Sequence, residues 1–206
     1  MAKITINRNV AGLRYPTLAS IKGRSSTIRA EFIKSVIPEI IPNPMEIEEA
    51  LAVLQQNKGS LCCSYCGDTP TEWDHFFSAV SNKMATGYIT EVYNLVPACG
   101  KCNQSKGAAY WKNWIRGKAT LSPTSRLSNG KLNITKEQLE VKIGILKDFE
   151  EWGKARITKL NFDSVSGHEF AEYFKSCEDL IDKLAAYEET AIALKIKVEG
   201  TLQKRT

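Results

Sequence analysis

The sequence of 206 residues has no apolar run near the ~18 residues that a membrane-spanning helix needs, and it has no basic-then-apolar leader at its start. These absences predict a cytoplasmic chain without a membrane partner. Internal repeats and low-complexity segments are also missing. The hydrophobic content of 43% is enough to bury a core, so a folded protein is expected.

A second absence concerns negative charge. No Asp or Glu occurs from Val92 to Lys136, although this stretch contains eight Lys and Arg residues and the formal net charge of the chain is only +5. A solvated helix face ordinarily mixes both signs, so the stretch predicts contact with a polyanion, with double-stranded DNA expected and RNA left open. The candidate DNA-binding residues are Lys106, Arg116, Lys118, Arg126 and, from an N-terminal basic set, Arg8, Arg14 and Arg24.

The cysteines form two pairs, each with two intervening residues: Cys63 with Cys66, and Cys99 with Cys102. In a reducing compartment such pairs favour a metal over disulfides. Four thiolates complete the tetrahedral shell of a structural Zn²⁺ and leave no position for a substrate. Cys62 also has a permitted ligand spacing to Cys66, and symmetry with the second pair favours Cys63 as the first ligand.

Three segments around these cysteines carry a family resemblance. They read WDHFF at 73–77, YNLVPAC at 93–99 and CNQSKG at 102–107. Together they resemble the HNH (ββα-metal) endonucleases, over roughly a quarter of the chain. The resemblance implies a zinc-stapled nuclease core in which two strands precede a helix.

The resemblance also implies roles for individual residues. His75 would be the general base that takes a proton from the attacking water, and Asn94 would hold the loop and the imidazole in place. Asp74 and Asn103 would bind a catalytic divalent cation at the phosphate. Asn103 departs from the family, where this position is more often His. Its amide oxygen and the Asp74 carboxylate make an all-oxygen shell that suits Mg²⁺ or Mn²⁺.

The chemistry of phosphodiester hydrolysis agrees with this reading, because one histidine and one metal can supply the nucleophile and the charge neutralisation. An unperturbed imidazole titrates near pH ~6.5 and is ready to accept a proton at neutral pH. Successive side chains of a strand point to opposite faces, so Asp74 and His75 cannot share a direction on a regular strand. We therefore expect a bulge or a strand end at this point.

We expect an α+β protein: a zinc-stapled ββα-metal nuclease core with flanking helices and a long C-terminal helix. Residues 1–60 would form an N-terminal helical, DNA-contacting segment, and 61–118 the nuclease core with its structural zinc. Residues 119–206 would form a loop and a C-terminal helical region for recognition or dimerisation. Within the core, strands are expected near 71–78 and 93–97, and a helix from about 101 to 117 with its tryptophans packed inward.

Local signals predict where the flanking helices begin. Capping-box patterns place helix starts at Asn43, Thr135 and Ser166, and the composition of 121–130 predicts a loop. From Phe170 to Val198 apolar residues recur in steps of three and four, as in a heptad seam. A helical hairpin within the chain or a homodimer would bury this seam, and the sequence leaves both open.

The favoured function is a site-specific type II restriction endonuclease. Cleavage of two strands with one active site per chain would need a dimer. A nicking or homing endonuclease, or a phage or defence nuclease, comes next. The non-enzyme alternative is a zinc-dependent nucleic-acid-binding protein in which the four cysteines only staple the fold.

Overall fold

The computed structural model describes residues 9–10, 13–14 and 19–202. Helices dominate, and the strands form short two-stranded antiparallel sheets, so the α+β class is confirmed. The chain divides into two compact units, Ala30–Phe174 on the one hand and Met1–Arg29 with Lys175–Thr206 on the other. These boundaries differ from the divisions expected at 60 and 118. Within the described part of the chain, no helix has the length and apolar character to cross a membrane.

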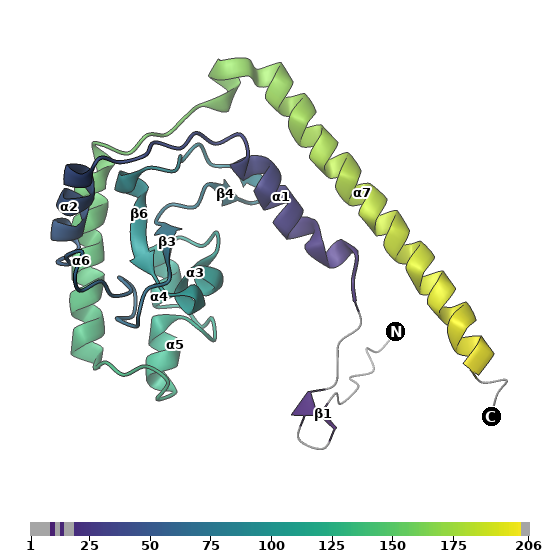
Figure 1. Cartoon of the computed structure of the whole chain (residues 1–206), viewed down its shortest axis with the longest axis horizontal. Coiled ribbons are helices and arrows are strands. Elements are labelled where there is room, and N and C mark those ends of the chain that lie inside the picture. The colour runs from purple at the N-terminus through teal and green to yellow at the C-terminus, as the bar shows by residue number, and fades with distance from the viewer. Residues whose placement is uncertain (1–8, 11–12, 15–18, 203–206) are drawn as a thin grey trace. The chain divides into compact units, whose positions relative to one another are not determined.

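The centre of the larger unit is an antiparallel ribbon of two strands, β3 (Glu72–His75) and β6 (Leu95–Ala98), which lie side by side in Figure 1. The register is regular, from Glu72 opposite Ala98 to His75 opposite Leu95. Helix α3 (Gly100–Lys106) follows β6 almost at once. The chain therefore has the expected order of strand, strand and helix, with both strands shorter than expected.

The loop between β3 and β6 contains a small hairpin, β4 (Val80–Ser81) with β5 (Met84–Ala85), and a 3₁₀ turn, η2 (Val92–Asn94). Gly87 lies in this loop with φ +90, and a Cβ placed there would meet the Leu160 carbonyl oxygen at 2.2 Å. The Leu160 N–H in turn donates to the Gly87 carbonyl. The loop is thus packed, backbone against backbone, on the segment that follows α6.

The helix expected from 101 to 117 is two helices. α3 ends at Lys106 because Gly107 takes a positive φ of 48, and α4 (Trp111–Ile115) begins after Tyr110. Trp111 and Trp114 are buried in the core cluster, as expected.

Two of the three predicted capping boxes are confirmed. α2 (Pro44–Val53) begins after Asn43 and α6 (Lys136–Lys154) after Thr135, each with the reciprocal side-chain bonds of the box. α2 and α6 pack against each other, as Figure 1 shows. The loop predicted at 121–130 is wrong: α5 (Pro123–Ser128) forms there because Ser122 caps it and Pro123 suits a first turn.

The long C-terminal helix is present as α7 (Phe162–Leu202), with 41 residues. It runs through Ser166, so the predicted start at that residue is wrong. In the larger unit its Tyr173 ring lies 5.2 Å from the Phe32 ring of α1 (Ser25–Lys34). In the other unit Arg29 of α1 donates to Glu178, and Cys177 is buried.

The smaller elements of that second unit are β1 (Asn9–Val10), which pairs with β2 (Leu13–Arg14), and η1 (Lys22–Arg24). The later part of the predicted seam on α7 is exposed at Tyr187, Leu194 and Val198.

Candidate functional site

The first component of the site is a cluster of four buried cysteines. The sulfur atoms of Cys63, Cys66, Cys99 and Cys102 all lie within 4.8 Å of one another. Two backbone bonds close the first knuckle: the Cys63 N–H donates to the Asp68 carbonyl at 2.7 Å and the Gly67 N–H to the Cys63 carbonyl at 2.8 Å. The four predicted ligands are thus brought together, and they could hold a zinc ion.

Cys62 stands outside this cluster. It is only half-buried, and the Lys142 ammonium donates to its sulfur at 3.6 Å. Inside the cluster the thiols share hydrogen bonds. The bond with Cys102 is the largest of the effects that lower the pKa of Cys63, to about 4. The pKa of Cys102 is raised by its bonds with Cys63 and Cys66 and, to a smaller degree, by burial. Within the cluster, Cys63 is thus the thiol that is favoured as a thiolate, which is the form that binds a metal.

The second component is His75, the last residue of β3. Its Nε2 lies 2.9 Å from the Thr90 hydroxyl. Thr90 is anchored in turn, because its N–H donates to the Pro38 carbonyl and its carbonyl accepts from the Ile40 N–H. Burial lowers the pKa of His75, and the nearby ammonium groups of Lys34 and Lys106 lower it further. The imidazole is therefore neutral at pH 7 and can accept a proton.

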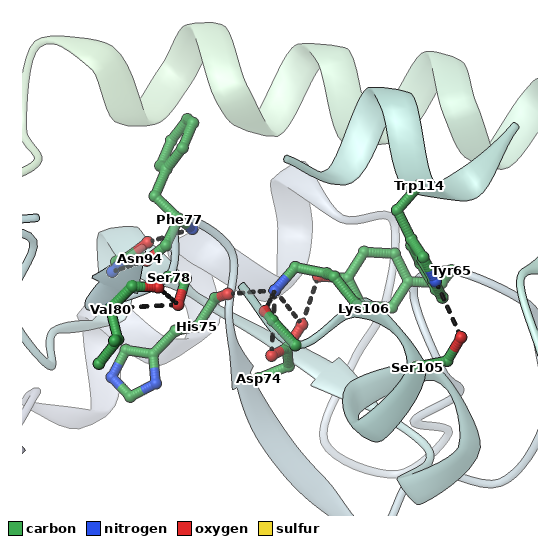
Figure 2. A network of polar contacts seen from close by, with 11 residues as sticks. Tyr65, Asp74, His75, Phe77, Ser78, Val80, Asn94, Ser105, Lys106 and Trp114 are labelled. Carbon is green, nitrogen blue, oxygen red and sulfur yellow. Dashed lines mark hydrogen bonds and ion pairs between the residues drawn. The ribbon is translucent and has the colours of Figure 1, made fainter. Parts of the chain in front are cut away.

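Asn94 holds the loop that follows His75. It is fully buried, its amide nitrogen donates to the Phe77 and Ile89 carbonyls at 3.0 and 3.1 Å, and its oxygen accepts from the Phe77 N–H at 2.7 Å. Both amide hydrogens and the oxygen are thus in use. Figure 2 shows Asn94 beside Phe77, so its contact is with the loop backbone and not with the imidazole.

Asp74 lies on the opposite face of β3 from His75, with 4% of its surface exposed. The Lys106 ammonium lies 3.0 Å from Asp74 Oδ2 and 3.3 Å from Oδ1, and the Tyr65 hydroxyl donates to Oδ2 at 2.6 Å. Lys106 also donates to the His75 carbonyl at 2.7 Å. In Figure 2 the three polar groups meet while the imidazole points away.

This arrangement does not fit the expected cation shell of Asp74 and Asn103. The Asp74 carboxylate is already bound on both oxygens and is closed off from solvent, while burial raises its pKa against the opposing effects of Lys106 and Tyr65. Asn103 is half-buried on α3. Among the described residues, the four cysteines are the only group of three or more His, Cys, Asp or Glu side chains placed to hold a metal. The register of β3 with β6 contains no bulge, and β3 ends at His75. Asp74 and His75 therefore stay on opposite faces of the strand, as the alternation of side chains predicts.

Comparisons of the chain with protein-family models, with curated proteins and with solved structures find no match.

The expected DNA-binding residues separate into two groups. Lys106 is 2% exposed and Arg126 3%, so both side chains are buried within the fold and their expected contact with DNA stays a prediction. Arg116 makes two bonds to Glu140, at 2.7 and 2.6 Å. Lys118 and Arg24 are exposed. Arg8 lies outside the described residues, and only the backbone of Arg14 is described.

The acid-free stretch is thus less positive in space than in sequence, because Asp and Glu side chains from other parts of the chain form ion pairs with four of its basic residues. The ion pairs are Lys106 with Asp74, Lys112 with Glu150, Arg116 with Glu140, and Arg126 with Asp68. The remaining basic residues of the stretch are exposed: Lys101, Lys118, Lys131 and Lys136.

Two residues near His75 were missed at the level of sequence. Lys34, at the end of α1, is close enough to lower the pKa of His75, and about half of its side chain is exposed. Trp73 shares the His75 face of β3 and is 42% exposed. Strand alternation could have identified Trp73, whereas Lys34 is 41 residues from His75 in the chain and carried no local signal.

Proposed function

We propose that the chain is a DNA endonuclease of the HNH type, with His75 as the general base. The observation that carries this proposal is the placement of His75: a neutral imidazole at the end of β3, held by Thr90, with its following loop clamped by Asn94. A zinc knuckle that only staples a fold does not need a histidine that is held in place separately from the four cysteines. The four cysteines would bind Zn²⁺ as a structural ion.

In the proposed reaction the His75 imidazole takes a proton from a water molecule, and the resulting hydroxide attacks the phosphorus. The bond from phosphorus to the 3′ oxygen breaks, and that oxygen takes up a proton from solvent. The Lys34 ammonium, whose charge already acts on His75, would offset charge on the phosphate oxygens. No step runs through the expected Mg²⁺ or Mn²⁺, because Asp74 is bound to Lys106 and Tyr65.

Within this class a site-specific type II restriction endonuclease acting on double-stranded DNA is the first choice. The exposed lysines of the acid-free stretch supply backbone contacts that do not depend on sequence. The exposed seam residues of α7, Tyr187, Leu194 and Val198, would suit a homodimer, which two-strand cleavage by one site per chain requires. A nicking, homing, phage or defence nuclease would share the same site.

The deciding experiment is the digestion of a sequenced DNA of phage length, with Mg²⁺, with Mn²⁺ and without added cation, followed by mapping of the ends. The chain offers a matched control, because its second histidine, His168, lies on α7 with an exposed side chain. We expect His75→Ala to lower the cleavage rate by about 10²–10⁴-fold and to leave DNA binding in a gel shift unchanged. His168→Ala should cleave like the wild type. Cleavage by His75→Ala at the wild-type rate would remove His75 as the base.

The second candidate is a non-catalytic zinc-dependent nucleic-acid-binding protein. The closed pair of Asp74 and Lys106 favours it, because that pair denies the carboxylate to a catalytic cation. Retention of DNA in the gel shift without cleavage under any of the three cation conditions would support this candidate. Discrete fragments in the digest would support a site-specific nuclease, and a smear would indicate a non-specific one.

A further inference from the structure

Arg126 reaches the cysteine cluster from outside the strand–strand–helix segment. It lies on α5, a helix fixed by Ser122, whose hydroxyl donates to the Gly117 carbonyl and accepts from the Ser125 N–H. Arg126 Nη1 lies 3.5 Å from the Cys66 sulfur and 3.9 Å from the Cys102 sulfur. One guanidinium nitrogen therefore contacts a cysteine from each of the two pairs.

The second nitrogen of the guanidinium is held as well. Arg126 Nη2 lies 2.6 Å from Asp68 Oδ2, and the backbone carbonyl of Asp68 accepts the Cys63 N–H that closes the first knuckle. The planar fork of an arginine can serve both directions at once, which the single ammonium of a lysine cannot do. Asp68 thus orients the fork so that its other arm faces the sulfur atoms.

The electrostatics of the cluster call for a cation at this position. A Zn²⁺ ion with four thiolates carries a net charge of −2, and the four sulfur atoms here belong to buried residues. Buried charge is costly unless opposite charge and hydrogen-bond donors surround it. Arg126, itself 3% exposed, is a charged donor in contact with two of these sulfur atoms, those of Cys66 and Cys102.

We propose that Arg126 is the counter-cation of the metal site and sets its affinity for zinc. Its guanidinium contacts the Cys66 and Cys102 sulfur atoms, supplies positive charge beside them and ties both knuckles to α5. The assignment is independent of nuclease activity, and it explains why an arginine inside the acid-free stretch is withdrawn from the surface. The competing explanation is that Arg126 only pairs with Asp68 and that its distance to the sulfurs has no consequence.

The test measures zinc release to an excess of a chromogenic chelator, and the spectrum of the Co²⁺-substituted protein. We expect Arg126→Met to bind zinc about 10–100-fold more weakly than the wild type, as for other outer-shell partners of metal ligands. Arg126→Lys should release zinc several-fold faster than the wild type and shift the sulfur-to-cobalt charge-transfer bands. Arg116→Met is the matched control, because it removes an exposed pair of Arg116 with Glu140 that includes no cysteine, and it should change neither readout.

Asp68→Asn separates the two explanations. It removes the charge that pairs with Nη2 and leaves the guanidinium beside the sulfurs, so its loss of zinc affinity should be smaller than that of Arg126→Met. Equal losses in these two variants would overturn the proposal, as would wild-type affinity in Arg126→Met. If Arg126→Met does not fold, Arg126→Lys decides: an unchanged release rate with unchanged cobalt bands would overturn it.

Discussion

The two faces of β3 differ sharply although their residues alternate along one short strand. On one face Asp74 is sealed in a closed network with Lys106 and Tyr65. On the other, Trp73 is exposed and the half-buried His75 meets a single hydroxyl, that of Thr90. The first face has the properties of a structural clamp and the second those of a reactive surface. Adjacent positions in a motif can therefore serve separate purposes.

The clamp face is joined to the cysteine cluster through α3, which begins directly after Cys99 and ends at Lys106. We expect Cys99→Ser to disrupt both faces of β3, because both depend on the fold that the metal holds together. The variant should lose its zinc and its cooperative unfolding transition, since the apparent binding energy of a structural zinc, roughly 10–16 kcal/mol in small peptides, is folding energy. Elemental analysis and thermal melting followed by circular dichroism measure both.

The matched control for that variant is Cys62→Ser, because Cys62 stands beside the cluster without belonging to it. It should retain about one zinc per chain. A Cys99→Ser protein that kept its zinc and its wild-type melting temperature would show that the four cysteines are not the ligand set.

Lys106→Met breaks the clamp face alone. It leaves the Asp74 carboxylate buried without a cation, which costs about 3–5 kcal/mol of unfolding free energy. Urea unfolding measures the loss. Lys58→Met is the control, because it removes an exposed pair with Glu48 and should cost no more than ~1 kcal/mol. If Lys106→Met were as stable as Lys58→Met and instead lost DNA affinity, Lys106 would be a DNA contact after all.

The smallest expected effect concerns the open face and its pH dependence. Because the folded pKa of His75 lies below the ordinary value near ~6.5, its neutral form persists to lower pH in the folded chain. The cleavage rate should hold its plateau below pH ~6.5 and fall only as the pH passes the lowered pKa. The stability that comes from keeping His75 neutral is present above the unfolded pKa and is lost as the pH falls through the folded one.

Lys34→Met should raise the pKa of His75, because it removes one of the two nearby positive charges. The acid limb of the pH–rate profile would then move to higher pH, and a titration of the His75 ring by nuclear magnetic resonance would move with it. An acid limb that stays in place in Lys34→Met would mean that another group controls the rate.

Sequence reasoning succeeded where the cause is local. The capping boxes at Asn43 and Thr135 involve residues three apart, and the two cysteine pairs have a spacing typical of a metal knuckle. It failed where the outcome depends on packing between distant segments. In the sequence, Lys106 and Arg126 looked like basic residues without acidic partners, because those partners, Asp74 and Asp68, precede the acid-free stretch.

The heptad pattern of α7 shows a similar limit. The periodicity predicted a long helix, which the structure contains, but the same periodicity could not place its beginning. No Gly or Pro lies between Asn161 and Ser166 to stop a helix from beginning earlier, and Ser166 is compatible with a helix interior as well as with a cap. The segment 121–130, with three serines and one proline, was likewise compatible with a short capped helix as much as with a loop.

The cysteine cluster also determines the topology of the chain around the candidate base. A metal bound by Cys66 and Cys99 would close a ring between positions 33 apart, and this ring contains β3, the β4–β5 hairpin, η2 and β6. Closing a loop of that size removes about 3–4 kcal/mol of conformational freedom from the unfolded chain in the chain-entropy model of cross-links. His75, Thr90 and Asn94 all lie inside the ring. A protease that cut the backbone once within it would therefore leave both fragments tethered through the metal, with the three side chains still linked to one scaffold.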